Sequence, residues 1–264
     1  MNTHPSIFAF TDCKDANTIT RLNGRLTALF EGSLIESVGV NSDIEAAGCI
    51  LDIFDALRKG TSDYIVIGNL APRTEKHHKN GAPFCIGRYN NILVIGTKTC
   101  FTMLAKFGFM TEIQETDVET VCSKFLTKEE AHRIANSQFR SFEYVPLLAK
   151  WAYDKADIPS VLSSIPSTFD NKVWWIDNFG NVKTTLIEDQ VTDHVHNETI
   201  TLMLGEKEMT LPFFQKLADV PKGAVACIIG SSGYDTKRFM EIVLQGGNAS
   251  AELGITIGEN VVVK

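Results

Sequence analysis

The stretch IFAFTD, residues 7–12, indicates how the chain begins to fold. Its first four residues are apolar and are typical of a short buried strand, after which Thr11 and Asp12 open a loop. Working outward, we expect strands at 34–40, 64–67, 84–86 and 91–95, and helical segments at 19–30, 43–57, 101–107 and 128–153. This alternation predicts an α/β/α domain built on a mostly parallel sheet.

The second half of the chain has a different pattern. Residues 158–171 contain two prolines and five serines or threonines without periodicity, which is typical of an interdomain linker. Short β-type runs follow at 173–176, 199–203, 209–211, 225–229, 242–244 and 260–263, and they predict a smaller all-β barrel or sandwich. The expected organisation is an α/β N-terminal domain at 1–157, a linker at 158–171 and a β-barrel C-terminal domain at 172–264.

The composition narrows the classes of function. The chain has 264 residues and a net charge of −7, so it has no general attraction for phosphate backbones. No apolar run approaches the roughly 18 residues that suggest a membrane helix. The opening residues, MNTHPSIFAF, lack the basic start and long apolar stretch of a signal peptide. We therefore expect a cytoplasmic protein that binds neither nucleic acid nor membrane, with its six cysteines reduced.

Two motifs in the second half carry the strongest functional signal. One is WIDNFGNVKTT at 175–185; the other is GSSG at 230–233, followed by EI at 241–242, QGGNA at 245–249 and LG at 253–254. In order and spacing they resemble IDxFGNxxTN and GSSG…LEIAxNQGSAAxxLG. These are signatures of the S-adenosylmethionine (SAM) hydroxide adenosyltransferase family, whose relatives include fluorinases and chlorinases. Residues 234–240, directly after GSSG, form an apparent insertion.

The first half resembles the same family more loosely. Phe10-Thr11-Asp12 is placed like the family's TTDFG loop, with Cys13-Lys14 in place of Phe-Gly. Residues 43–47, DIEAA, resemble its D-[IV]-x-E-A-A helix, and residues 65–69, IVIGN, reach the place of its VVDPG strand end. The resemblance covers nearly the whole chain and is strongest from about residue 173 onward.

The resemblance implies a site for SAM or a related adenosine ligand, without a metal. It implies that Asp12 accepts hydrogen bonds from the ribose hydroxyls and Asp177 from the ligand's ammonium group. It also implies that Phe179 packs on the adenine and that Asn181 bonds its edge. Taken alone, Asp12 is also typical of a turn or cap, and NFGN is also typical of a β-turn.

A second group of implied contacts lies in GSSG and QGGN. Ser231 and Ser232, followed by a glycine, would offer hydroxyl and N–H groups to the ligand's carboxylate, as small anion nests do. Gln245, Gly246 and Asn248 would allow the backbone to approach the purine closely. Taken alone, the glycines are also typical of a bulge or a turn.

Three positions differ from those of the hydrolytic members, which activate water with an Asp, an Arg and a His. Asn69, Lys76 and Phe139 stand there instead. An amide takes up no proton at neutral pH, a lysine lacks the guanidinium fork, and a phenyl ring does no proton chemistry. The basic loop at 71–80, APRTEKHHKN, offers Glu75 and His77 as a new acid–base group; the alternative is a solvated loop.

The sequence therefore leaves three hypotheses open. The first is an enzyme that displaces the sulfur from the ribose C5′ of SAM with a nucleophile other than base-activated water. The second is a catalytically inactive protein that binds an adenosyl ligand. The third is a structural or interaction protein that has kept only the fold. The resemblance further implies a homotrimer, in which each site lies between the N-terminal domain of one subunit and the C-terminal domain of its neighbour.

Overall fold

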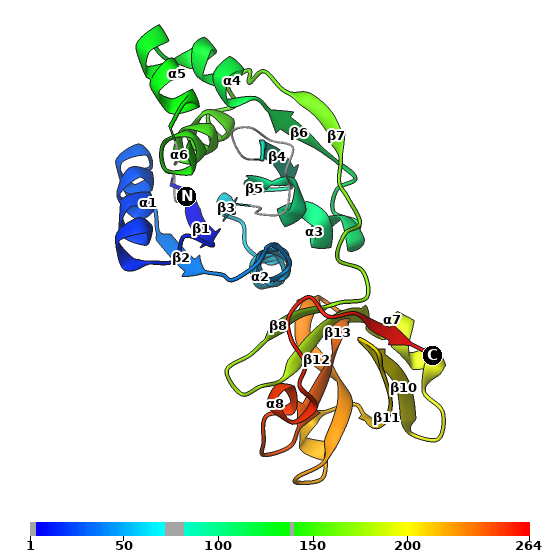
Figure 1. The fold of residues 1–264 in the computed structure, drawn as a ribbon. Helices are drawn as coiled ribbons and strands as arrows, with labels where there is room; N and C mark the ends of the chain where they lie inside the picture. The colour runs from blue at the N-terminus through cyan, green and yellow to red at the C-terminus, as the bar shows by residue number, and fades with distance from the viewer. Residues whose placement is uncertain (1–3, 72–81, 138–139) are drawn as a thin grey trace. The chain divides into compact units, whose positions relative to one another are not determined.

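The first of two sheets has seven strands in the order β2-β1-β3-β5-β4-β6-β7 (Figure 1). The strands β2, β1, β3 and β5 run parallel, and β4, β6 and β7 continue the sheet in antiparallel pairs beyond β5. The strands are β1 (Ser6–Thr11), β2 (Ile35–Gly39), β3 (Tyr64–Asn69), β4 (Phe84–Tyr89), β5 (Ile92–Thr97), β6 (Glu112–Thr116) and β7 (Val161–Ser164).

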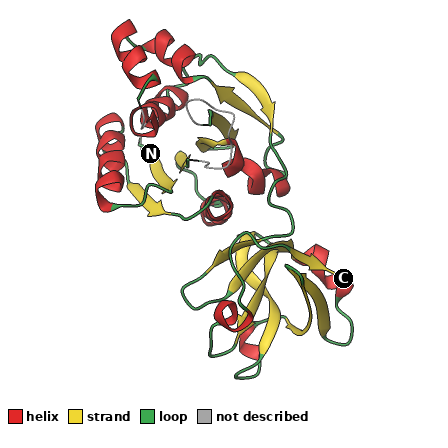
Figure 2. Ribbon diagram, viewed as in Figure 1, coloured by secondary structure: helices red, strands yellow, loops and turns green. Residues whose placement is uncertain are grey.

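The computed structural model describes residues 4–71, 82–137 and 140–264. Contacts between Cα atoms group Met1–Ile50 with Lys59–Ser167 into a first unit, and Leu51–Arg58 with Thr168–Lys264 into a second unit. Figure 2 shows that most of the helices accompany the first sheet, whereas the second unit consists mainly of strands.

The helices of the first half alternate with its strands. They are α1 (Ala16–Leu29), α2 (Asp43–Leu57), η1 (Lys98–Phe101), α3 (Thr102–Lys106), α4 (Val118–Phe125), α5 (Lys128–Ala135) and α6 (Arg140–Tyr153). Asp15 caps α1 by accepting a hydrogen bond from the Thr18 N–H group at 2.9 Å, which explains why this helix begins where it does. Within the described residues, none of the helices is long and apolar enough to cross a bilayer.

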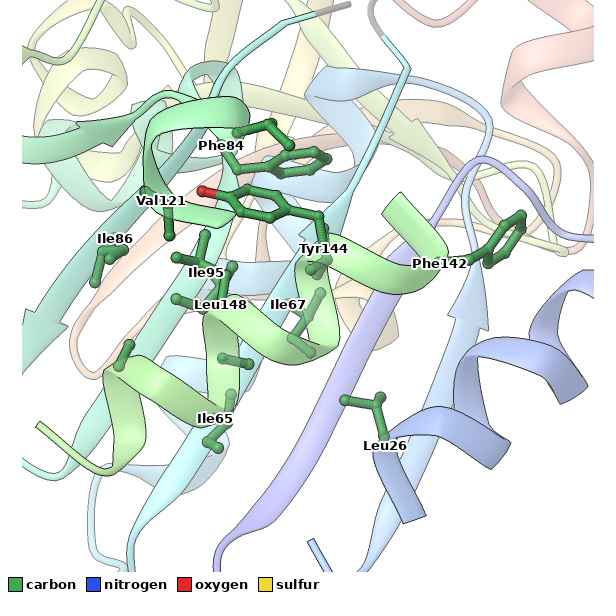
Figure 3. Close-up of a cluster of buried hydrophobic side chains, with 14 of the residues drawn as sticks. Leu26, Ile65, Ile67, Phe84, Ile86, Ile95, Val121, Phe142, Tyr144 and Leu148 are labelled. Atoms are coloured by element: carbon green, nitrogen blue, oxygen red, sulfur yellow. The ribbon is translucent and has the colours of Figure 1, made fainter. Parts of the chain in front are cut away.

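Helices cover both faces of the first sheet. On one face, Leu26 of α1 and Leu148 of α6 belong to the same buried cluster as Ile65 and Ile67 of β3 (Figure 3). Because successive strand residues point to opposite faces, the next residue, Gly68, faces the other layer. A Cβ atom at Gly68 would lie 2.3 Å from the Cys100 Sγ atom in η1 and 3.3 Å from Ile50 Cδ1 in α2. This arrangement confirms the predicted α/β/α class.

The packing of α6 on the sheet includes one buried polar chain. Tyr144 is fully buried, and its hydroxyl donates to Thr116 Oγ1 at 2.8 Å. The Thr116 hydroxyl in turn donates to the Phe84 carbonyl oxygen at 2.7 Å. Figure 3 shows the Tyr144 ring next to that of Phe84. Since a buried hydroxyl needs a partner, this chain fixes how α6 sits over β4 and β6.

Three elements of the first unit differ from the sequence expectation. Strand β6 and helix α4 were not predicted. Strand β6 contains one large apolar residue, Ile113, and α4 is only eight residues long, although Val118, Val121, Cys122 and Phe125 have the spacing of an amphipathic helix. The segment 158–171, expected as a linker, contains strand β7, which pairs antiparallel with β6. Val161 and Leu162 in this edge strand are 66% and 67% exposed, so hydrogen bonding to β6 holds β7 with little burial of its apolar side chains.

The second unit is built on the other seven-stranded sheet, in the order β14-β10-β11-β12-β13-β9-β8. Its strands are β8 (Val173–Ile176), β9 (Val182–Ile187), β10 (Thr199–Leu204), β11 (Lys207–Phe214), β12 (Val225–Tyr234), β13 (Lys237–Leu244) and β14 (Val261–Val263). Short helical segments connect them: α7 (Glu188–Val191), η2 (Thr192–His194), η3 (Leu217–Asp219) and α8 (Ala249–Leu253). The pairing of β11 with β12 is parallel, and the other pairs are antiparallel.

The two ends of this sheet meet. The Val173 N–H donates to the Glu259 carbonyl and the Val261 N–H donates to the Asn171 carbonyl, both at 2.8 Å. These bonds join the entrances of β8 and β14, so the sheet is nearly closed into a barrel. Its interior holds one apolar cluster that includes Val182. The predicted all-β barrel is confirmed.

The buried cysteines are unreactive at neutral pH. Cys85, Cys100, Cys122 and Cys227 lie in the interior. Burial raises the pKa of Cys85 and of Cys100 to about 12, and that of Cys122 to about 11. Because the thiolate is the reactive form, these side chains act as small apolar groups at neutral pH.

We predict that Gly68→Ala destabilises the protein by about 1–3 kcal/mol, because the added methyl group overpacks the layer between β3 and η1. Gly24→Ala is the matched control. Gly24 lies within α1 with open space at its Cβ position, so alanine there should stabilise by about 0.5–1 kcal/mol. Urea denaturation measures both changes. A Gly68→Ala variant as stable as the wild type would contradict the close packing.

Candidate functional site

The carboxyl ends of β1 and β3 bring the first group of predicted site residues together. These strands pair in parallel, with Thr11 beside Asn69. The Asn69 side-chain N–H donates to Thr11 Oγ1 at 3.1 Å, and the Asp12 backbone N–H donates to the Asn69 carbonyl at 3.4 Å. In a parallel α/β sheet, this edge is where ligands bind.

Asp12 has one satisfied and one unsatisfied carboxylate oxygen. Its Oδ2 atom accepts a hydrogen bond from the Ala71 N–H group at 3.0 Å. Its Oδ1 atom is buried and meets no N–H or O–H donor in the part of the chain that the structure describes. The adjacent thiol of Cys13 is a weak donor; burial, followed by the Asp12 charge, raises its pKa. A fixed carboxylate oxygen of this kind is suited to accept a bond from a hydroxyl group.

Asn69 is held as a structural amide. It is only 2% exposed, and its N–H group is directed to the fully buried Thr11 hydroxyl. The Cys13 backbone N–H also donates to that hydroxyl oxygen, at 3.1 Å. Since an amide has no basic site at neutral pH, Asn69 organises the turn after β1 and supplies no general base.

The neighbouring polar groups at this edge come partly from α2 and η1. The Thr99 hydroxyl donates to Asp43 Oδ2 at 3.0 Å. The Lys14 ammonium bonds to the Asn41 side-chain oxygen, and the Asn41 side chain donates to Glu45 Oε2 at 3.0 Å. The pairings of Thr99 with Asp43 and of Lys14 with Asn41 were not predicted from the sequence, because they join segments 56 and 27 positions apart. The predicted residues Lys76, Glu75, His77 and Phe139 lie outside the described residues.

In the second unit, Asp177 and Asn181 fold the turn between β8 and β9. Asp177 Oδ1 accepts from the Phe179 and Asn181 N–H groups, at 2.9 and 3.0 Å, and its Oδ2 accepts from the Asn181 side chain at 3.0 Å. Gly180 completes the turn with a φ of +83°, a conformation that favours glycine. Both side chains therefore have a structural task in this turn.

Phe179 stands out at the tip of this turn. Its side chain is 70% exposed, although Asp177, Gly180 and Asn181 of the same turn are engaged in hydrogen bonds. The turn also packs on the segment after β13: the Ser250 N–H donates to the Gly180 carbonyl at 3.0 Å, and a Cβ at Gly180 would lie 2.1 Å from Asn248 Cγ. The structure thus places Phe179 and Asn248 in adjacent segments of the chain's two motifs.

The QGGN segment is a tight turn. The Gly247 N–H donates to the Leu244 carbonyl at 3.0 Å, and Gly246 has a φ of +81°. The Gln245 N–H donates to the Ala224 carbonyl at 3.1 Å, which binds the turn to the segment before β12. Asn248 caps α8 through its Oδ1 atom, which accepts from the Ala251 N–H at 2.8 Å.

The GSSG segment lies within β12 at a bulge. The register between β12 and β13 shifts between Ile229 and Gly233, and Ser231 is exposed whereas Ser232 is buried. Asp52, also in the second unit, faces this bulge. The Gly233 N–H donates to Asp52 Oδ1 at 2.9 Å, and the Ser232 hydroxyl also bonds this carboxylate. Burial nevertheless raises the pKa of Asp52.

A buried ion pair connects the two motifs of the second unit. The Lys183 ammonium in β9 lies 2.5 Å from Glu241 Oε1 in β13, and the two side chains are 7% and 6% exposed. The same ammonium lies 5.5 Å from the centre of the Trp175 ring. A Cβ at Gly230 would come within 2.0 Å of Glu241 Oε1, so this position has no room for a side chain. Among the described residues, no group of three or more His, Cys, Asp or Glu has a geometry suited to a metal ion.

The second half of the chain matches a known family of domains. Residues 171–262 match the family model of the SAM hydroxide adenosyltransferase C-terminal domain. The family resemblance inferred from the sequence is thereby confirmed, on the segment where its motifs are strongest. No curated protein matches the chain in sequence.

Two solved structures are similar over the whole chain. An uncharacterized conserved protein from Thermotoga maritima has a TM-score of 0.72 at 15% identity, covering 98% of this chain and 100% of that protein. A conserved hypothetical protein from Thermus thermophilus has a TM-score of 0.64 at 16% identity, with the same coverage of both chains. At these identities the likeness is one of fold.

We predict that Lys183→Met destabilises the protein by about 3–5 kcal/mol, because it leaves the Glu241 carboxylate buried without its cation. The double variant Lys183→Met with Glu241→Leu removes both charges and should lose much less stability than Lys183→Met alone. Urea denaturation of the two single variants and the double variant gives the coupling energy. Additive losses would show that the pair does not act as a unit.

Proposed function

We propose that this chain, whose residues 171–262 match the SAM hydroxide adenosyltransferase C-terminal domain, binds SAM or a related adenosyl ligand. The family match supports the ligand class. The strand-end polar group of the first unit and the exposed aromatic turn of the second unit supply the complementary chemistry. The first suits a ribose, and the second suits an adenine.

The observation that carries the proposal is the state of Asp12. Its carboxylate is fixed by the Ala71 N–H group, at the edge of the sheet where α/β proteins bind ligands. Its buried Oδ1 atom has no N–H or O–H donor among the described residues. Because an unmet buried carboxylate oxygen is costly, the site favours a ligand that brings a hydroxyl group to it. A ribose offers two.

Phe179 supports the second half of the proposal. An aromatic ring that is 70% exposed at the tip of an otherwise rigid turn presents a flat apolar surface. Adenine has a matching π face, and stacking of a base on an aromatic side chain contributes about 1–3 kcal/mol. Both Asp177 oxygens accept hydrogen bonds within the turn, and this holds Phe179 in position. Because a carboxylate oxygen can accept more than one hydrogen bond, we propose that Asp177 also accepts from the ligand's ammonium group.

The proposal concerns binding more than reaction. Asn69 stands where hydrolytic relatives carry an aspartate, and its amide is already hydrogen-bonded to Thr11. Water activation at this position would require a base that Asn69 does not provide. We therefore propose that the protein binds an adenosyl ligand and does not hydrolyse SAM by the family's usual route.

We predict that Asp12→Asn weakens adenosine binding by about tenfold or more, because it removes a charge-assisted acceptor for the ribose hydroxyls. Asp15→Asn is the matched control: it makes the same chemical change three residues along, at an exposed helix cap that asparagine also serves well. Calorimetry with adenosine measures both. Equal affinity in the Asp12→Asn and wild-type proteins would remove Asp12 from the site, and no binding by the wild type would overturn the proposal.

We further propose a homotrimer in which the Asp12 of one subunit and the Phe179 of its neighbour serve the same site. Asp12→Ala and Phe179→Ala should each abolish tight adenosine binding when expressed alone. Co-expression of the two should restore a fraction of the sites, because some mixed trimers then pair an intact Asp12 with an intact Phe179. Calorimetry on the co-purified protein measures that fraction. No recovery in a mixed trimer verified by light scattering would contradict shared sites.

A further inference from the structure

The hydrogen-bond donors of the GSSG segment already bind a carboxylate of the protein itself, that of Asp52. Gly233 adopts a φ of +128°, and a Cβ there would lie 2.4 Å from the Lys237 carbonyl oxygen, so the bulge requires glycine. In this conformation the Gly233 N–H points at Asp52 Oδ1, at 2.9 Å. The hydroxyl of Ser232, which is 5% exposed, bonds the same carboxylate. N–H and hydroxyl groups converging on one carboxylate form a small anion nest.

Asp52 is held in this place by a further set of contacts. One turn along the helical segment, Asp55 Oδ1 accepts from the Asp235 N–H at 2.8 Å and its Oδ2 accepts from Arg238 Nη1 at 3.0 Å. Arg238 also donates to the Ser231 carbonyl at 2.8 Å. Residues 51–58 are therefore tied to both sides of the β12–β13 hairpin, and Asp52 occupies the nest as part of a fixed arrangement.

The charges around Asp52 leave little capacity for a second anion. The charged groups that act on it are Lys183, which favours its ionised form, and Asp55, which disfavours it. The nearby cations already have partners: Lys183 pairs with Glu241 at 2.5 Å, and Arg238 and Arg58 both pair with Asp55. A ligand carboxylate brought to the GSSG donors would have to displace Asp52 and then remain beside it without a cation of its own.

We propose that Asp52 is a specificity residue that makes this protein select adenosyl ligands without a carboxylate, namely adenosine and its neutral 5′-thioethers, over SAM. The inference rests on the proposed adenosyl site and narrows its ligand class. The Ser231–Gly233 segment, which the sequence indicates as the nest for a ligand's carboxylate, is filled by Asp52. The amino-acid end of SAM then has no anion nest to enter.

Two ligands that differ at one end test this proposal. Methylthioadenosine and S-adenosylhomocysteine share the adenosine and the thioether, and only the second carries the amino-acid group. In calorimetry, the wild type should bind methylthioadenosine at least about tenfold more tightly than S-adenosylhomocysteine. Asp52→Ser, which empties the nest, should raise affinity for S-adenosylhomocysteine about tenfold or more and change that for methylthioadenosine by less than about twofold.

Two further variants keep the result interpretable. Asp219→Ser removes an exposed carboxylate of η3, outside both residues 51–58 and the β12–β13 hairpin, so the preference between the two ligands should stay as in the wild type. Asp52→Asn keeps the volume and an acceptor oxygen but removes the charge; it should reduce the preference, and it replaces Asp52→Ser as the decisive variant if the serine variant does not fold.

The outcomes separate this inference from the proposed function. If the wild type binds neither ligand, the proposed adenosyl site itself fails. If it binds S-adenosylhomocysteine as tightly as methylthioadenosine, the adenosyl site stands and the role of Asp52 is overturned. A preference that is unchanged in both Asp52 variants would likewise overturn it. A preference that is lost equally in Asp219→Ser would show that removing any carboxylate of the second unit produces the effect, and it would contradict the specific role of Asp52.

Discussion

The ion pair between Lys183 and Glu241 is the constraint around which the second unit is arranged. Two charged side chains are taken almost completely out of water between β9 and β13, so their positions must match closely for the fold to tolerate them. Lys183 follows the turn that carries Phe179, and Glu241 precedes the QGGN segment. The pair therefore fixes the relative placement of both motifs. Gly230 must lack a side chain because the glutamate occupies the adjoining space.

The polar groups of the first unit lie at the carboxyl ends of β1 and β3. There, Thr11 and Asn69 satisfy one another, and a single oxygen of Asp12 is left without a strong donor among the described residues. The contrast between the two units is informative. Asp177 and Asp52 of the second unit accept hydrogen bonds from within that unit, whereas Asp12 Oδ1 meets no N–H or O–H donor among the described residues. That difference is the physical basis for assigning the ribose end of a ligand to Asp12.

The sequence predicted those features that depend on local pattern. The apolar runs of β1, β3 and β5 and the periodicity of α1 and α2 identified the α/β half, and the closely spaced short strands identified the barrel. Strand β7 was missed because hydrogen bonding to β6, rather than side-chain burial, holds it in place. The two motifs identified the resemblance to the family, yet the sequence could not show that Asp177 and Asn181 bind each other.

The contact between Asp52 and Gly233 could not be predicted from the sequence pattern. Asp52 lies 181 positions before Gly233, in a helix whose periodicity explains it as one polar residue among others. Nothing in either segment alone indicates that they meet. The role of Asp52 depends on the bulge in β12, on the glycine-favouring conformation of Gly233 and on the nearby charge of Lys183. Each of these is a property of the folded chain.

The buried thiols can report local unfolding of the folded protein. A side chain such as Cys100, with a pKa of about 12 and no exposed surface, reacts with thiol reagents only when its layer opens. Cys85 and Cys100 belong to the first unit, and Cys227 to the second. Modification of Cys85 or Cys100 therefore shows that the first unit has opened, and modification of Cys227 shows that the second unit has opened. The modified position identifies the unit that unfolded locally.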